Sequence, residues 1–160
     1  MNEDFMSIIK TGSAQYEGLG KSGKGYVSTQ SSALDNQPYG FNTRFEDKPG
    51  TNPEELIGAA HASCFTMALS FALEGEGYKD GKLSTTCAIT LDKEGDGFKV
   101  SKSELTLEAD VPSISEEEFS KIANQAKDNC PISKLLDTEI SLKFTLKWTF
   151  TEIDRLTHWK

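Results

Sequence analysis

The feature that most constrains the fold is a run of apolar and small residues from Leu56 to Leu73. On a helix these residues occupy nearly every side: Leu56, Ile57, Ala59, Ala60, Ala62, Phe65, Met67, Ala68, Leu69, Phe71 and Ala72. This pattern is typical of a helix that is buried all round rather than one that lies on a surface. Because a chain of 160 residues has difficulty enclosing such a helix, we expect a partner subunit to help bury it.

Both ends of this helix carry recognisable signals. Asn52 can cap it, Pro53 suits its first position, and Glu55 stands where a capping-box acid reaches back to the backbone amide of the cap. Gly75 is a typical residue with which to end a helix. We therefore predict a helix from Asn52 to about Glu74.

The rest of the chain predicts strands and a second helix around this one. The expected elements are a glycine-rich hairpin within 11–30, a long loop with at most a short strand over 35–50, antiparallel strands over 83–91 and 98–111, an amphipathic helix over 115–129 capped by Ser115, a break or restart at Pro131, and a closing strand over 139–150. Residues 151–160 are not placed. Strands without a βαβ alternation predict one α+β domain over 1–160, with antiparallel strands packed on the central helix.

The charge balance argues against one class of partner. The chain has 25 acidic and 17 basic residues, a net charge of −8, whereas nucleic acid binds clustered Lys and Arg. No uninterrupted run of about 18 apolar residues is present, and Glu3 and Asp4 stand where a signal peptide carries positive charge. We expect a cytoplasmic protein with neither a nucleic-acid nor a membrane partner.

Three cysteines are the main candidates for chemistry. An odd number of widely spaced cysteines does not make a disulfide framework in a reducing compartment, and without CxxC or HxxxH spacing no metal site is expected. Cys130 lies between a predicted helix end and Pro131, so it would stand at a helix N-terminus, where a thiol pKa is lowered. Cys64, taken alone, is interpreted as a buried thiol of the apolar helix, and Cys87 as a core thiol on a strand.

Three further residues have both a plain and a functional interpretation. His61 lies one helical turn before Cys64, but a lone histidine on an apolar helix is more often a packed residue than a base, and its role stays open. Arg44 is the only arginine before the tail, although a single surface arginine is ordinary. Glu54 suits the start of a helix on electrostatic grounds alone.

Three segments carry a resemblance to a known family. They read QPYGFNTRF over 37–45, GTNPEELIGAAHASCF over 50–65 and NCPIS over 129–133. Together they closely resemble the OsmC/Ohr family, and the first looks like its OsmC branch; the match extends over about 15–148. The resemblance implies an intertwined homodimer in which antiparallel sheets pack around long buried central helices, with two equivalent sites at the interface.

The resemblance also implies a function. It indicates a thiol-dependent peroxidase that reduces organic hydroperoxides, with hydrogen peroxide as a further candidate substrate, in defence against oxidative or osmotic stress. Cys64 would be the peroxidatic cysteine and Cys130 the resolving one, while Arg44 and Glu54 would keep the attacking sulfur as thiolate. An external dithiol such as dihydrolipoamide would reset the enzyme, and no flavin, haem or metal would be required.

Helix geometry adds one constraint to this expectation. Glu54 and Cys64 are ten residues apart, so on one helix they are separated by about 15 Å. Glu54 would then act through Arg44 or from the partner subunit. Two rival functions are a dithiol redox sensor or disulfide reductase that consumes no peroxide, and a non-catalytic stress protein whose cysteines are core thiols.

Overall fold

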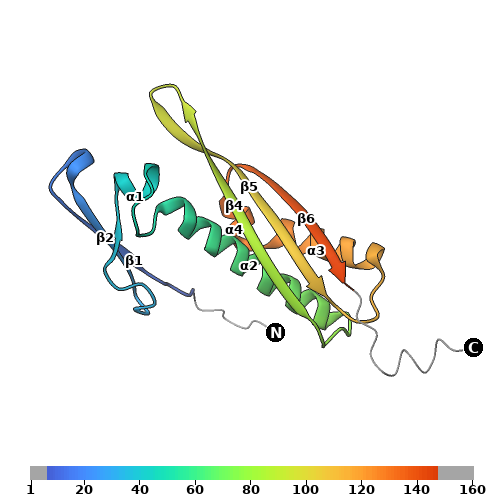
Figure 1. Cartoon of the computed structure of the whole chain (residues 1–160). Helices are drawn as coiled ribbons and strands as arrows, with labels where there is room; N and C mark the ends of the chain where they lie inside the picture. The colour runs from blue at the N-terminus through green and yellow to red at the C-terminus, as the bar shows by residue number, and fades with distance from the viewer. Residues whose placement is uncertain (1–6, 148–160) are drawn as a thin grey trace, which may run out of the picture. The chain divides into compact units, whose positions relative to one another are not determined.

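The structure, a computed structural model, describes residues 7–147 (Figure 1). The chain divides into two compact units, one ending at Pro53 and one beginning at Glu54. The single domain expected over 1–160 stays a prediction. The end of the predicted closing strand and the tail lie outside the described residues.

The first unit is a small antiparallel sheet followed by a short helix. Its strands are adjacent in chain order, and its elements are β1 (Gly12–Glu17), the 3₁₀ turn η1 (Gly20–Ser22), β2 (Lys24–Thr29), β3 (Gln37–Tyr39) and α1 (Phe41–Phe45). The predicted glycine-rich hairpin is confirmed as β1 and β2.

Helix α1 corrects the loop predicted over 35–50, which was expected to hold at most a short strand. The backbone N–H of Gly40 donates to Thr43 Oγ1 at 2.8 Å, and that of Arg44 donates to the Gly40 carbonyl at 3.1 Å. A helix of only five residues is too short to show a periodic pattern in the sequence, which is why the prediction missed it.

The second unit packs helices against a separate three-stranded sheet (Figure 1). Its elements are α2 (Pro53–Gly75), β4 (Lys82–Glu94), β5 (Gly97–Asp110), α3 (Glu116–Asn129), α4 (Pro131–Leu135) and β6 (Glu139–Lys147). The predicted long helix, hairpin and amphipathic helix are confirmed. The cap of α3 is confirmed too, because Ser115 accepts a hydrogen bond from the Glu118 amide at 3.1 Å.

Strand β6 departs from the expected antiparallel arrangement. β4 and β5 form an antiparallel hairpin, but β6 runs parallel to β5, with Leu105 opposite Leu142. A parallel neighbour requires a crossover, and α3 and α4 provide it by returning the chain to the end of the sheet where β5 began. The crossover matters for the site because it carries Cys130 between its two helices.

Within one chain, only one stripe of α2 is buried. Its buried residues recur every three or four positions: Gly58, His61, Phe65, Leu69 and Leu73. Of these, Phe65, Leu69 and Leu73 pack into a core with the inner face of β5 and the apolar face of α3. On the other side of the helix, Met67 is 58% exposed and Phe71 is 66% exposed. A single chain therefore leaves a large apolar surface of α2 uncovered.

Helix α2 is the one described helix that meets the length and composition of a membrane span. It is long and apolar enough to cross a membrane by length and composition, with a mean hydropathy of 1.6 over 18 residues, of which 28% are buried. This is weak evidence for a membrane span, since the core helix of a soluble protein has the same properties.

Candidate active site

The second unit brings Cys64 and Cys130 together. Cys64 lies in the middle of α2, and Cys130 lies at the junction between α3 and α4, 66 positions later in the chain. The Cys130 side chain lies near enough to Cys64 to raise the pKa of its thiol, and both thiols are free. Cys130 is fully buried, whereas Cys64 is half-buried and so retains access to small molecules.

Local backbone geometry fixes Cys130 at this junction. Its amide ends α3 by donating to the Ala126 carbonyl at 2.9 Å, and its carbonyl begins α4 by accepting from the Lys134 amide at 3.1 Å. Pro131 occupies the first turn of α4, so the predicted restart of the helix at this proline is confirmed. The resulting bend turns the side chain of Cys130 into the core.

The environment of Cys64 favours its neutral form. Burial raises the pKa of the Cys64 thiol, and the hydrogen bond to Cys130 raises that pKa further. A hydrogen bond from the Ile132 backbone has the opposite effect and lowers the pKa of Cys64. The sequence predicted that the start of α4 would lower the pKa of Cys130. In the structure, the Ile132 backbone in the first turn of α4 instead lowers the pKa of Cys64.

The other two predicted site residues belong to different units of the chain. Arg44 is an exposed residue of α1 in the first unit, where its guanidinium carbon stands 5.4 Å from the centre of the Phe45 ring. Glu54 lies in the first turn of α2. Since α2 is one continuous helix, the separation of about 15 Å between Glu54 and Cys64 holds within a chain. The placement of Arg44 and Glu54 beside Cys64 stays a prediction.

Arg44 belongs to an aromatic hollow within the first unit. This hollow has a volume of about 500 Å³, and among the residues that line it are Tyr16, Lys21, Tyr39, Phe41 and Arg44. The ammonium of Lys21 lies 4.8 Å from the centre of the Phe41 ring, a distance typical of a cation–π contact. The hollow therefore combines apolar rings with two cationic side chains.

Cys87 has the properties of a core thiol, as predicted. It projects from β4 toward Ser103 of β5, with 3.1 Å between its sulfur and Ser103 Oγ, and it packs against the main core. Burial raises the pKa of its thiol. Among the described residues, no group of three His, Cys, Asp or Glu side chains is arranged to hold a metal ion.

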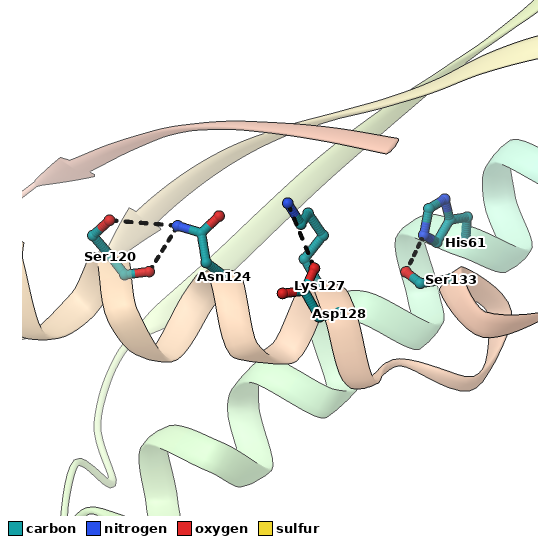
Figure 2. Close-up of polar contacts among 6 residues, drawn as sticks. All are labelled: His61, Ser120, Asn124, Lys127, Asp128 and Ser133. Atoms are coloured by element: carbon teal, nitrogen blue, oxygen red, sulfur yellow. Dashed lines mark hydrogen bonds and ion pairs between the residues drawn. The ribbon is translucent and has the colours of Figure 1, made fainter. Parts of the chain in front are cut away.

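His61 is part of a buried polar cluster that sequence reasoning did not predict. Its ring is fully buried, with Nδ1 2.6 Å from Ser103 Oγ and Nε2 2.8 Å from Ser133 Oγ. Figure 2 shows the contact between His61 and Ser133. A neutral imidazole donates with one ring nitrogen and accepts with the other, so both contacts are satisfied by an uncharged ring. The sequence held one signal for this cluster: Ser103 is a polar residue that alternates with Leu105 and Leu107 on the buried face of β5.

The buried imidazole makes stability depend on pH in a defined direction. Burial lowers the pKa of His61 below its ordinary value of 6.5, so the unfolded chain binds this proton more readily than the folded one. The free energy of unfolding is then expected to fall as the pH drops below about 6.5, by at most about 1.4 kcal/mol per pH unit for one proton. Urea denaturation at fixed protein concentration between pH 7.5 and 5.5 measures this slope.

His61→Gln is the control, because its side chain does not titrate. It should lose most of the slope above pH 5.5, where few carboxyl groups protonate. An equal slope in the wild-type protein and this variant would contradict a buried neutral histidine.

Comparison with known proteins agrees with this architecture. Residues 45–145 match the model of the OsmC family, described as OsmC-like protein. The chain is 51% identical over 142 residues to "Peroxiredoxin OsmC" of Escherichia coli (strain K12), an alignment that covers 89% of this chain and 99% of that protein. It is 27% identical over 124 residues to "Organic hydroperoxide resistance protein OhrB" of Bacillus subtilis (strain 168), covering 77% and 89% of the two chains.

Solved structures show the same fold. The crystal structure of OhrB of Bacillus subtilis superposes with a TM-score of 0.60 at 26% identity, covering 86% of this chain and 98% of that chain. An OsmC-like protein of unknown function from Vibrio cholerae has a TM-score of 0.69 at 14% identity, covering 87% and 100%, and it supports the fold alone. The predicted α+β class and family are thus confirmed, and the chain belongs to the OsmC family.

Proposed function

We propose that this protein reduces organic hydroperoxides, with Cys64 as the attacking cysteine and Cys130 as the cysteine that resolves it. The chain is a thiol-dependent peroxidase that acts in the defence against oxidative stress, as the names of its relatives, peroxiredoxin and organic hydroperoxide resistance protein, support. The observation that carries the assignment of residues is the proximity of a half-buried thiol on α2 and a fully buried thiol at the α3–α4 junction.

The reaction needs only thiols and the peroxide. The Cys64 thiolate attacks one peroxide oxygen, so that an S–O bond forms, the O–O bond breaks, and the leaving alkoxide takes a proton to become an alcohol. The Cys130 sulfur then attacks the Cys64 sulfenic acid; an S–S bond forms, the S–O bond breaks, and the hydroxyl leaves as water. An external dithiol, such as dihydrolipoamide, reduces the disulfide by two successive exchanges.

Cys64 requires a cation to act as the nucleophile. Burial and the neighbouring Cys130 thiol both raise the pKa of Cys64 and so favour its neutral form. The species that attacks a peroxide is the thiolate. A guanidinium stays charged at every working pH, and Arg44 is the candidate donor because it lines the aromatic hollow that suits the organic part of a hydroperoxide. Glu54 would orient this guanidinium by a charge-assisted hydrogen bond.

A homodimer completes this arrangement. The uncovered side of α2 borders a hollow of about 920 Å³ within the second unit, lined in part by Ala62, Met67, Leu83 and Val111. This hollow, together with the exposed apolar side chains of Met67 and Phe71 on α2, is suited to a second copy of α2. Because Glu54 is too far from Cys64 within one chain, the dimer also offers a route by which Glu54 serves the site of the partner subunit.

A dithiol redox sensor or disulfide reductase is the second candidate function. The same contact between Cys64 and Cys130 supports it, since a sensor also needs two thiols that form a disulfide. This alternative predicts a disulfide but no consumption of peroxide. The negative net charge of −8 fits a cytoplasmic location, which we propose for either function.

Single cysteine variants test the roles of the three thiols. Cys64→Ser should abolish peroxide consumption, because it removes the nucleophile. Cys130→Ser should still react once, leaving a Cys64 sulfenic acid that dimedone traps, while Cys87→Ser serves as the control and should keep turnover. The assay follows cumene hydroperoxide, a fatty-acid hydroperoxide and hydrogen peroxide with dihydrolipoamide as reductant, and mass spectrometry locates the dimedone adduct.

Two results would contradict the assignment. A trapped sulfenic acid on Cys130 of the Cys64→Ser variant, with none on Cys64 of the reciprocal variant, would reverse the two roles. Disulfide formation with an added oxidant but no loss of any of the three hydroperoxides would favour the sensor or disulfide reductase.

A charge on the uncovered side of α2 tests the dimer. Phe71→Lys places a cation in the proposed interface, so we expect a monomer and a fall of at least about tenfold in kcat/KM. Gln125→Lys, on the exposed side of α3, adds the same charge and should stay dimeric and active. Analytical ultracentrifugation and the peroxide assay measure the two properties, and a monomeric variant with undiminished activity would rule out an obligatory dimer.

A further inference from the structure

The buried His61 cluster links the three elements that surround the paired cysteines. His61 comes from α2, Ser103 from β5 and Ser133 from α4, and Figure 2 shows the His61 and Ser133 side chains directed toward each other from their helices. Ser133 is only 9% exposed and His61 is not exposed at all. A buried, fully satisfied polar network of this kind is a strong determinant of how its elements are positioned.

Two residues of the cluster, His61 and Ser133, are each three residues from one of the paired cysteines. His61 precedes Cys64 by three residues on α2, and Ser133 follows Cys130 by three residues at the start of α4. Residues three apart lie on the same side of a helix. The two helices are therefore joined by two neighbouring contacts, Cys64 with Cys130 and His61 with Ser133.

Helix α4 needs such support because it is short. Five residues are too few to form a stable helix on their own, so the position of α4 depends on tertiary contacts. Its exposed residues, such as Leu135 at 74% exposure, contribute little burial to hold it. The hydrogen bond between Ser133 and His61 fixes α4 to α2, and the bond between His61 and Ser103 fixes the imidazole to the sheet.

We propose that His61 and Ser133 are positioning residues for the disulfide-forming step, holding the Cys130–Pro131 turn against Cys64. The inference rests on the proposed peroxidase function. In that step the Cys130 sulfur must lie in line with the S–O bond of the Cys64 sulfenic acid, so that the S–S bond forms as hydroxide leaves and takes up the thiol proton as water. A displacement of about 1 Å can slow a reaction that depends on such alignment by about a hundredfold.

The proposal separates the two chemical steps. Attack of Cys64 on peroxide forms no bond to the Cys130 sulfur, and moving Cys130 away would only relieve its effect of raising the pKa of Cys64. The link between His61 and Ser133 should therefore matter less for this step. Closure of the disulfide depends directly on where the turn places Cys130. Removing the Ser133 hydroxyl should therefore slow closure more than it slows sulfenic acid formation.

Three serine variants test this separation. Ser133→Ala removes the hydroxyl that His61 contacts, and Ser133→Thr keeps it. Ser120→Ala is the matched control, because the hydroxyl of Ser120 contacts only Asn124 of the same helix among the hydrogen bonds described for it (Figure 2). Circular dichroism and thermal unfolding verify that each variant folds.

The measurement is a single turnover with one equivalent of cumene hydroperoxide, quenched at successive times. Dimedone trapping quantifies the Cys64 sulfenic acid, and mass spectrometry quantifies the Cys64–Cys130 disulfide. We expect Ser133→Ala to close its disulfide at least about tenfold more slowly and to accumulate sulfenic acid, while Ser133→Thr and Ser120→Ala stay within about threefold of the wild-type rate.

The outcomes distinguish this proposal from the function on which it rests. Closure at the wild-type rate in folded Ser133→Ala, or equal slowing in Ser133→Ala and Ser133→Thr, would overturn the positioning role. Absence of a Cys64 sulfenic acid in the wild-type protein would instead overturn the peroxidase assignment. If Ser133→Ala does not fold, His61→Leu enters the same assay, because its side chain forms no hydrogen bond to either serine; closure at the wild-type rate there would also overturn the proposal.

Discussion

The contact between the Cys64 and Cys130 side chains is the interaction on which the account of this molecule depends. It joins the middle of α2 to the α3–α4 junction, and so ties the long apolar helix to the crossover that makes β6 parallel to β5. The side chains of the two thiols approach each other there from separate elements. The buried cluster of His61, Ser103 and Ser133 lies beside it and fixes the same two helices to the sheet.

The same contact creates a chemical problem that the surrounding structure must solve. A thiol that is partly buried beside another thiol has a raised pKa and resists ionisation, yet only its thiolate attacks a peroxide. Within the second unit, the Ile132 backbone is the described group that lowers the pKa of Cys64. In our proposal Arg44 supplies the missing charge, and a second subunit covers the exposed apolar side of α2.

The sequence predicted features that depend on local signals, and it missed those that depend on distant contacts. Pro53, Ser115 and Pro131 marked where helices begin, because capping and the proline ring act within a few residues. The parallel pairing of β6 and the partners of His61, 42 and 72 residues away, leave no such local signal. The pairing of Cys64 with Cys130 came from the family resemblance, since position at a helix start alone favoured Cys130 as the reactive thiol.

The most direct test of the central claim is a peptide map of the wild-type protein after one equivalent of cumene hydroperoxide, without reduction and with free thiols alkylated. The account predicts one intrachain disulfide between Cys64 and Cys130, with Cys87 recovered in its alkylated form. A disulfide that contains Cys87, or Cys64 and Cys130 both recovered as free thiols after the peroxide has been consumed, would contradict it.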